Sequence, residues 1–493
     1  MNNAQLRSPM YTFNAYDWGD GNLLTAYVPE FWARESLMVL VEELVMANLV
    51  YRDFEEEIAN FGDTVNTRLP GDFVALRKTD VDDVTIQDAI ATNVSVVLNQ
   101  HVHVSFMIKD GQETLAMEDL VETYMRPAMR ANGNIIDKIL LAQFTYFLLQ
   151  GYGSFGTFNS TNAQDRFLNV RRIFNTRSVP EENRNFVLTI NSETAVLATS
   201  LFLQAQQVGD DGTALREASL GRKFGLNTFK SVFAPSVIEG NTTKTTAQAG
   251  AVNHSAGYPV GYTGSIVTNV FTGAVTVGQW VVLDGVPYRV NAVTNTLGAT
   301  TAITLDRPLI NAAASADTIV SYTTCEVNQP TSPTGYPVGY SAYIDYDTNS
   351  VTLQQGQMIS FQTTAPTYAY NSQPGGPPAI TSPIYVIVAT DGATEFMLDR
   401  PLEVALADDD IINPGPGGEY NFAFIRNALA LVARPLSPPK AGTGALSAIA
   451  NYNGLAMRAT IWYDGRKQGH LVTLDLLLGV KVLDARMGVV VFG

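Results

Sequence analysis

The chain has 493 residues, of which 46% are hydrophobic, 10% aromatic and 16% charged, and its formal net charge is -16. This composition excludes a disordered polymer and a coiled coil, and the acidic balance disfavours general nucleic-acid binding. The single cysteine, Cys325, excludes an intramolecular disulfide framework and a Cys-based zinc site. The N-terminus lacks a basic segment followed by an apolar stretch, and no run of about 18 apolar residues occurs, so we expect neither Sec export nor a membrane span.

The N-terminal region combines an aromatic arm with a helix. Trp18 and Trp32 lie among other aromatics, Gly, Asn and Pro without a helical period, so this arm must pack on another part of the fold or on a neighbouring subunit. Over residues 35–50 apolar residues recur at helical spacing with Glu42 and Glu43 between them, which predicts an amphipathic helix.

Residues 63–110 change to strand periodicity. Alternating runs over 94–98 and 101–108 predict long strands, and the charged segment 68–83, with its Pro and Gly, predicts an exposed extended loop. Mixed charges on such a loop suit salt-sensitive contacts with an adjacent copy. The candidate interface residues of this loop are Arg68, Arg77, Lys78 and Asp82.

The next segment carries the strongest helical signal of the chain. Apolar residues at three- and four-residue steps predict a long helix over about 113–151, which Pro127 and Gly133 should bend or interrupt. Residues 152–240 mix shorter helices, such as 193–207, with loops and end in a strand-like run.

An acidic, internally repeated insertion follows. Between residues 241 and 420 there are four bases and fourteen acids, and GYPVGY occurs at 257–262 and again at 335–340. The Gly-Gln pairs at 278 and 356 keep the same offset of 78 residues, and both copies reach an LDRPL element. Two copies with a period this long indicate a tandem domain duplication. Period-two alternation with Gly turns predicts a small antiparallel barrel or sandwich in each copy, with the Gly-Gln pairs in equivalent turns.

Several motifs resemble known binding sites but lack a residue or context that those sites require. Gly151, Gly153 and Gly156 spell G-x-G-x-x-G but follow a helix and lack an acid about 20 residues on, so a helix-ending loop is the interpretation. His101 and His103 share a strand face without a third metal ligand. The acids at 345 and 347, and at 408–410, form no calcium-loop pattern. We therefore expect no enzyme, no cofactor and no metal site.

The order of segments resembles a protein family. It comprises EELVMANLVYRDFEEEIANFGDTVNTRLPGDF, the extended loop, a long helix around MRPAMRANGNIIDKIL, the inserted β region, NFAFIRNALALVARPL and ATIWYDGRKQGHLVTLDLLLGVKVL. This order resembles the major capsid (coat) protein of tailed bacteriophages, in the branch where the Hong Kong ninety-seven fold carries an inserted telokin-like β-barrel. That branch usually has a single barrel, whereas this chain duplicates it.

The resemblance implies a fold class and a division of the chain. The class is α+β, a tailed-phage major capsid fold with a spine helix, an extended loop, axial and peripheral domains, and an inserted, duplicated all-β barrel domain. The implied parts are an N-terminal arm and helix (1–48), an extended loop and peripheral strands (49–112), the spine helix and first axial part (113–250), barrel copy one (251–325), barrel copy two (330–412), and the axial and peripheral completion (413–493).

The resemblance also implies a function. Many copies would self-assemble as pentamers and hexamers into an icosahedral virion shell that encloses double-stranded DNA, assembled in the host bacterial cytoplasm. Scaffolding, portal and decoration proteins would be its partners, with no membrane. Some relatives cross-link a loop lysine to another subunit, but nothing marks Lys78 for that role. The alternative is a tail or surface structural protein with tandem β adhesion modules, although an adhesin would carry its modules at one end.

Contact with packaged DNA should be non-specific and weak per subunit, because a chain this acidic repels phosphate outside local basic patches. The candidate lumen-facing bases are Arg166, Arg171, Arg172, Arg177 and Lys223. The alternative for these residues is a set of internal ion pairs. The acidic insertion is expected on the outer surface, where it faces water.

Overall fold

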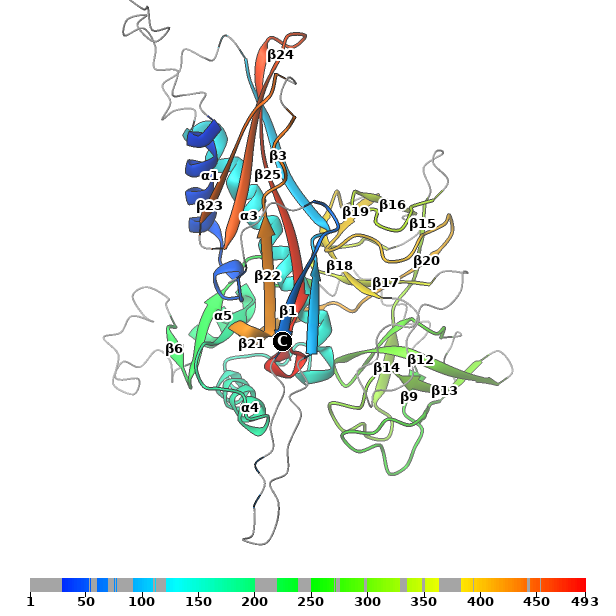
Figure 1. Cartoon of the computed structure of the whole chain (residues 1–493). Helices are drawn as coiled ribbons and strands as arrows, with labels where there is room; N and C mark the ends of the chain where they lie inside the picture. Colours follow the sequence, from blue (N-terminus) through cyan, green and yellow to red (C-terminus); the bar gives the residue numbers. More distant parts are fainter. Residues whose placement is uncertain are drawn as a thin grey trace, which may run out of the picture.

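The computed structural model has an α+β architecture with two β-barrels on one side of a main body (Figure 1). This confirms the expected fold class with its inserted, duplicated barrel. The structure describes residues 29–52, 54, 60–69, 75, 77, 92–109, 111, 121–199, 220–237, 250–269, 271, 275–296, 299–328, 335–347, 351–362, 383–392, 394–440, 444–452 and 454–493. Over these ranges no helix has the length and apolar character needed to cross a membrane.

Five strands form the sheet that we call the arm sheet. β25 (Gly469–Val482) pairs along one edge with β3 (Gln100–Lys109) and along the other with β24 (Leu455–Asp464) and β22 (Leu429–Arg434). β23 (Leu446–Tyr452) adds next to β24. The long strands β3, β24 and β25 carry the sheet beyond the helices, so it projects from the main body as an arm (Figure 1). The strand predicted over 101–108 is confirmed as β3.

Two helices cover one face of the arm sheet. α1 (Pro29–Glu43) starts and ends earlier than the predicted helix over 35–50, and a short 3-10 turn, η2 (Met46–Asn48), follows it. Trp32 on α1 is fully buried, with its ring centroid 5.9 Å from that of Phe106 on β3. Alternation along the strands supplies the apolar face on which such helices pack.

The long helix predicted over 113–151 is divided in the structure. A π-helical turn, η4 (Val121–Met125), leads into α3 (Arg126–Ala142), and the 3-10 segment η5 (Gln143–Gln150) follows. Pro127 lies in the first turn of α3, directly after the π-helical turn, so the helix changes type at the position where an interruption was predicted. Gly133 lies inside α3, which continues through it.

A second sheet, the central sheet, completes the main body. Its strand order is β4 (Gly151–Gly153), β26 (Gly488–Phe492), β21 (Gly418–Ile425), β5 (Arg184–Leu188), β7 (Leu226–Lys230) and β6 (Arg222–Lys223). The helices α4 (Ala163–Thr176) and α5 (Ile190–Leu197) accompany it, the latter shorter than the helix predicted over 193–207. Phe167 and Phe174 of α4 pack with Phe186 of β5 in a separate apolar core. Beside the arm sheet, β1 (Thr64–Leu69) pairs with β2 (Thr92–Val97).

The two copies of the repeat have the same strand order. The first barrel contains β9 (Gly250–Ala251), β10 (Ile266–Val267), β11 (Trp280–Leu283), β12 (Val286–Thr296), β13 (Ala299–Leu305) and β14 (Thr318–Ser321). The second barrel contains β15 (Cys325–Val327), β16 (Ile344–Asp347), β17 (Met358–Gln362), β18 (Ile384–Thr390), β19 (Glu395–Leu398) and β20 (Ile411–Pro414). In the first barrel a bridge between Val252 and Thr268 joins the edge strands β9 and β10, the pair that β15 and β16 form in the second.

The equivalent turns of the two barrels use the same contacts. Gln279 and Gln357 are both buried, and each donates from Nε2 to a backbone oxygen, that of Tyr322 at 2.7 Å and that of Gly415 at 2.9 Å. Gly278 and Gly356 before them have φ of 92° and 82°, a conformation that favours glycine. The retained Gly-Gln pairs are therefore turn-forming residues in both copies.

The chain enters and leaves the insertion at one place. β8 (Ser236–Val237) precedes the insertion and pairs antiparallel with the start of β21, which follows it. Tyr420 N also donates to Pro235 O at 2.9 Å. Because the two ends are adjacent and paired, the barrels interrupt the main body without disrupting its central sheet.

The buried carboxylate of Asp137 connects α3 to the segment that follows α1. Asp137 on α3 accepts hydrogen bonds from the backbone N–H groups of Val45 and Met46, both at 3.1 Å, and so caps η2. Burial raises the pKa of Asp137 to about 6, and these backbone hydrogen bonds only partly oppose that rise. The raised pKa makes this contact sensitive to pH.

We predict that Asp137→Asn changes how the free energy of unfolding depends on pH. The folded-state pKa lies above the unfolded value, so the contribution of Asp137 is fully present below pH about 4 and is lost as the pH rises through about 6. A shift of about two pKa units corresponds to roughly 3 kcal/mol. Urea unfolding at pH 4.5 and pH 7 should show the variant gaining free energy of unfolding relative to the wild type as the pH rises. A difference between the two proteins that does not change with pH would contradict the prediction.

Candidate assembly surfaces

The arm sheet leaves one face open. Opposite the face under α1 and α3, cross-strand neighbours carry polar side chains, among which Ser105 Oγ and Thr473 Oγ1 lie 2.9 Å apart. His101 and His103 are exposed on the same face, with ring centroids 5.6 Å apart. A polar sheet face of this kind can face water or a neighbouring protein without burying an unpaired group.

A buried carboxylate organises the middle of that face. Asp475 on β25 accepts from both Arg458 Nε, at 3.0 Å, and Arg458 Nη2, and it lies 3.3 Å from His101 Nε2. Burial raises the pKa of Asp475, but the hydrogen bonds from His101 and Arg458 outweigh burial and hold the pKa below its ordinary value. The ionised carboxylate therefore ties β25 to both of its neighbours, β24 and β3.

The structure describes three of the six predicted interface residues, Trp32, Arg68 and Arg77. Trp32 lies on α1 and is buried against β3, inside the subunit. Arg68 lies on β1, and Arg77 is exposed. Trp18, Lys78 and Asp82 lie outside the described residues.

The predicted basic residues lie around α4 and β6. Arg172 and Arg177 are exposed, and Arg171 donates to Phe224 O at 3.2 Å and lies 3.4 Å from Glu181. Lys223 is half-buried on β6. These side chains lie close to solvent on one side of the central sheet and form the α4 basic surface.

Arg166 differs from the other predicted bases because it is only 7% exposed. Its guanidinium lies 5.1 Å from the ring centroid of Tyr152 and donates to Thr157 Oγ1. This arrangement packs the cation inside the subunit and leaves little of it to contact a partner. Arg222 on β6, which the sequence analysis did not single out, is exposed beside Lys223. The adjacent bases Arg222 and Lys223 in the sequence could have indicated that Arg222 belongs to this surface.

The Asp-Arg pair of each LDRPL element forms the same latch in each barrel. Asp306 Oδ2 lies 2.9 Å from Arg307 Nη1, and Asp399 Oδ2 lies 2.9 Å from Arg400 Nη1. Each aspartate also accepts from a backbone N–H of the facing strand. Each arginine donates to a backbone oxygen, of Pro287 or Ile384, and stacks over a tyrosine ring. The shared LDRPL element therefore lies at the end of the equivalent strand in each barrel, β13 and β19.

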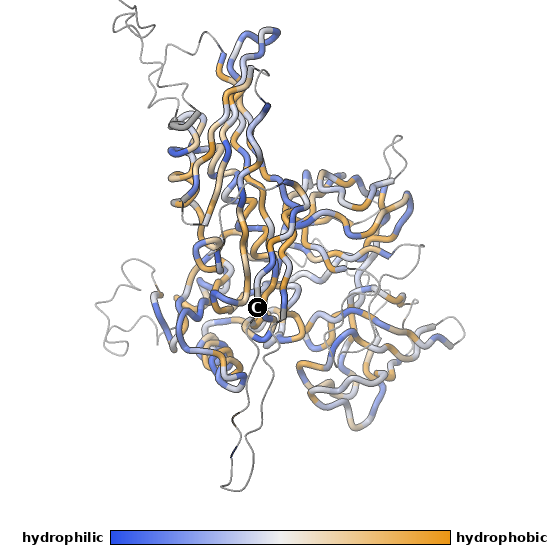
Figure 2. Tube along the Cα trace, in the orientation of Figure 1, coloured by the Kyte–Doolittle hydropathy of each residue, from blue (hydrophilic) through white to orange (hydrophobic). Residues whose placement is uncertain are grey.

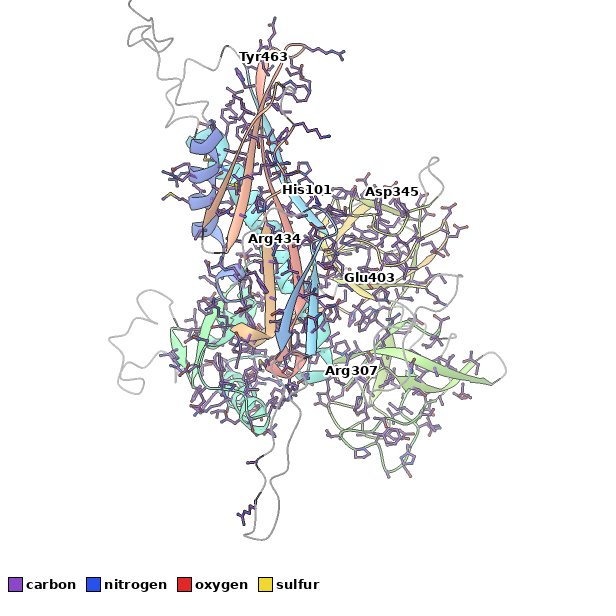
Figure 3. The ribbon with its side chains drawn as sticks, in the orientation of Figure 1. His101, Arg307, Asp345, Glu403, Arg434 and Tyr463 are labelled. Carbon is purple, nitrogen blue, oxygen red and sulfur yellow. The ribbon has the colours of Figure 1, made fainter. Side chains whose placement is uncertain are left out.

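These latches lie on the sides of the barrels that contact the main body. Arg400 lies 5.5 Å from the ring centroid of Tyr146 on η5, and Gln100 Nε2 on β3 donates to Asp399 O at 2.7 Å. Burial raises the pKa of Tyr420 on β21, and the positive charge of Arg307 in the first barrel partly opposes that rise. Figure 3 labels Arg307 beside the main body. Tyr146 and Tyr420 could not be assigned this role from the sequence, because neither belongs to the repeat and only the folded chain brings the latches near them.

Three motifs set aside in the sequence have ordinary structural positions. Gly151 and Gly153 lie in β4, and α4 begins only at Ala163, so these glycines do not open a helix. Burial raises the pKa of Cys325 to about 12, which leaves little thiolate at neutral pH. Among the side chains that the structure describes, no three His, Cys, Asp or Glu residues group in a way that could hold a metal ion.

Two exposed aromatic residues at the distal end of the arm were not predicted from the sequence. Trp462 and Tyr463 near the end of β24 are 53% and 45% exposed. Adjacent strand residues point to opposite faces, so the two rings lie on opposite sides of the arm sheet. Two successive large aromatics just before the turn DGRKQG were the sequence signal that could have identified them.

Comparison with solved structures finds matches among phage structures. The chain matches a structure from Mycobacterium phage Che8 with 12% identity and a TM-score of 0.39, covering 91% of this chain and 90% of that chain. It matches the capsid structure of the cyanophage P-SCSP1u with 9% identity and a TM-score of 0.38, covering 90% of each chain. It matches the mature capsid of bacteriophage PhiM1 with 6% identity and a TM-score of 0.36, covering 90% and 86%.

Identities this low transfer no residue's role from those proteins to this chain. No protein-family model matches the chain, and no curated protein matches it.

We predict that Arg400→Met destabilises the protein strongly, whereas Asp399→Asn/Arg400→Met recovers most of the loss. Asp399 is fully buried, so removal of its cation leaves an uncompensated charge and costs roughly 3–5 kcal/mol, while a neutral amide needs no counter-charge. Chemical unfolding of the full chain measures both variants.

The control for this prediction is Glu403→Ala. Glu403 also pairs with Arg400, at 3.0 Å, but is 48% exposed and screened by water, so its loss should cost under about 1 kcal/mol. A loss for Arg400→Met no larger than that for Glu403→Ala would contradict the buried-pair explanation.

Proposed function

We propose that this chain is the major capsid protein of a tailed double-stranded DNA phage, which self-assembles as pentamers and hexamers into an icosahedral shell. The observation that carries the proposal is the arm sheet, whose long strands project beyond the main body with one polar face open and aromatic residues at the distal end. Such an arm offers large surfaces to neighbouring copies and little to a small substrate. The family resemblance of the sequence supports the same function.

The division of the chain follows from this proposal. α3 and its flanking turns would be the spine helix, β1 and β2 would begin and end the extended loop, and the arm sheet would belong to the peripheral domain. The central sheet with α4 and α5 would be the axial domain around the five- and six-fold positions. The adjacent, paired ends of the insertion support these assignments, because they make the barrels an interruption of one body.

The same pairing weighs against the alternative of a tail or surface protein with tandem adhesion modules. Such a protein needs its modules at a free end, where they reach a target. Here β8 and β21 hold both ends of the insertion in the main body, and the contact of Arg400 with Tyr146 on η5 keeps the second barrel against it.

We place the barrels on the outer surface of the shell. The acids of the insertion would repel packaged DNA, whereas toward water they favour solubility. This placement leaves the barrels able to contact neighbouring subunits or decoration proteins. Scaffolding and portal proteins would be further partners, and assembly would take place in the host bacterial cytoplasm.

The α4 basic surface is our candidate for the lumen side. It would contact packaged DNA through Arg171, Arg172, Arg177 and Lys223, with Arg222 beside them. These contacts would be electrostatic and independent of sequence, because exposed guanidinium and ammonium groups bind phosphates without reading bases.

We predict that electron microscopy of the purified full chain, with its natural assembly partners present, shows closed shells or ring-like capsomers. The projecting arm offers a large surface, with the exposed Trp462 at its distal end, that neighbouring copies can cover, so assembly should be the preferred state. Monomers or fibres alone under these conditions would overturn the capsid function.

We predict that Arg172→Gln/Arg177→Gln weakens binding to random-sequence duplex DNA uniformly. Each lost phosphate contact should reduce the slope of log K against log salt by about 1, so the double variant should lose about 2. Fluorescence anisotropy over a salt series measures the slope, with Lys481→Gln, an exposed base on β25, as the control. An unchanged slope, or tight binding of one sequence at physiological salt, would contradict the prediction.

A further inference from the structure

The distal end of the arm carries an apolar row on the open face. Trp462 on β24 pairs with Leu471 on β25, and Leu471 pairs with Met107 on β3. Directly opposed residues point to the same side of a sheet, so these three side chains form one row. Trp462 is 53% exposed in the subunit, and an exposed tryptophan is a strong anchor when a partner covers it.

The turn beside this row is cationic. It joins Asp464 at the end of β24 to Gly469 at the start of β25 and contains the exposed Arg466 and Lys467. Asp464 Oδ1 accepts from Arg466 N at 2.9 Å, so this carboxylate is engaged by the turn backbone. The hydrophilic tip is visible in Figure 2. Together the row and the turn form the arm tip, an apolar anchor with a basic rim, which fits an acidic protein surface.

The second barrel presents such an acidic surface. Glu326 on β15 lies opposite Asp347 on β16, and Asp345 on β16 lies opposite Glu395 on β19. Buried residues alternate with these acids along the strands, so the four carboxylates point outward. Like charges directly opposite one another destabilise a sheet, and here two such pairs are adjacent. A cationic partner would relieve this repulsion.

The first barrel shows that the barrel fold does not need these acids. At the repeat offset of 78 residues, Asp345 corresponds to Val267 and Asp347 to Asn269. Val267 pairs with Ala302, which stands where Glu395 stands in the second barrel. The first barrel is therefore uncharged at these three positions while keeping the same strand order. Of the two barrels, only the second carries this acidic face.

We propose that the arm tip of one subunit docks on the acidic face of the second barrel of a neighbouring copy. Charge complementarity selects this occupant, and the exposed Tyr343, two residues before Asp345, supplies an apolar contact for Trp462. Within one subunit the arm tip, marked by Tyr463, and the barrel, marked by Asp345, lie apart (Figure 3), so the contact joins two copies. The proposal rests on the self-assembly proposed above and names one of its contacts.

A designed disulfide tests the contact in the full-length chain. Arg466→Cys and Asp345→Cys are introduced together, and assembled particles are treated with oxidised glutathione. The native Cys325 is only 4% exposed and does not compete. Denaturing gels without reductant should show covalent multimers that reductant removes. The matched control pairs Arg466→Cys with Val267→Cys, the equivalent and exposed position of the first barrel, and should remain monomeric on the gel.

The outcomes separate this contact from the capsid function itself. Particles of the test variant that give no multimers, or as many as the control, overturn the docking proposal and leave the shell intact. Absence of particles from the wild-type chain overturns the capsid function instead. If the cysteine variants do not assemble, a charge swap decides: Arg466→Glu should slow assembly by about tenfold, and added Asp345→Lys should restore it. Failure of that restoration overturns the docking proposal.

Discussion

The pairing of β25 with three other strands is the interaction on which the rest of the main body depends. This strand brings β3, from the first quarter of the chain, against β22 and β24, from its last part. Once the ladder forms, one face becomes apolar and is covered by α1 and α3, and the other remains polar. The arm that we propose as the assembly surface is this ladder extended past the helices.

The insertion shows how a duplicated module can serve two positions. Both barrels retain the Gly-Gln turn and the Asp-Arg latch, which hold the strands of each barrel together. In the second barrel the arginine of the latch also contacts Tyr146 of the main body, and in the first barrel the charge of Arg307 acts on Tyr420 of β21. The same motif therefore stabilises each barrel and interacts with the main body. The opposite faces of the two copies differ in charge.

Charge is separated within the subunit in a way that suits assembly. Acids collect on the second barrel, and exposed bases lie at the arm tip and around α4, although the whole chain is strongly acidic. Net charge keeps isolated subunits apart by repulsion, while local complementary patches favour defined contacts. Each such contact is weak by itself, but the overall affinity rises when many copies make the contact at the same time.

The sequence by itself determined the repeat, the alternation of β3 and the helical spacing of α1 and α3, because these patterns depend on neighbours along the chain. It did not determine which of its large and charged side chains lie inside. Trp32 and Arg166 are buried, whereas Trp462 is exposed. Alternation assigns residues to two faces of a strand, but only packing between distant segments decides which face is covered. The position of the assembly surface was therefore decided by the tertiary structure.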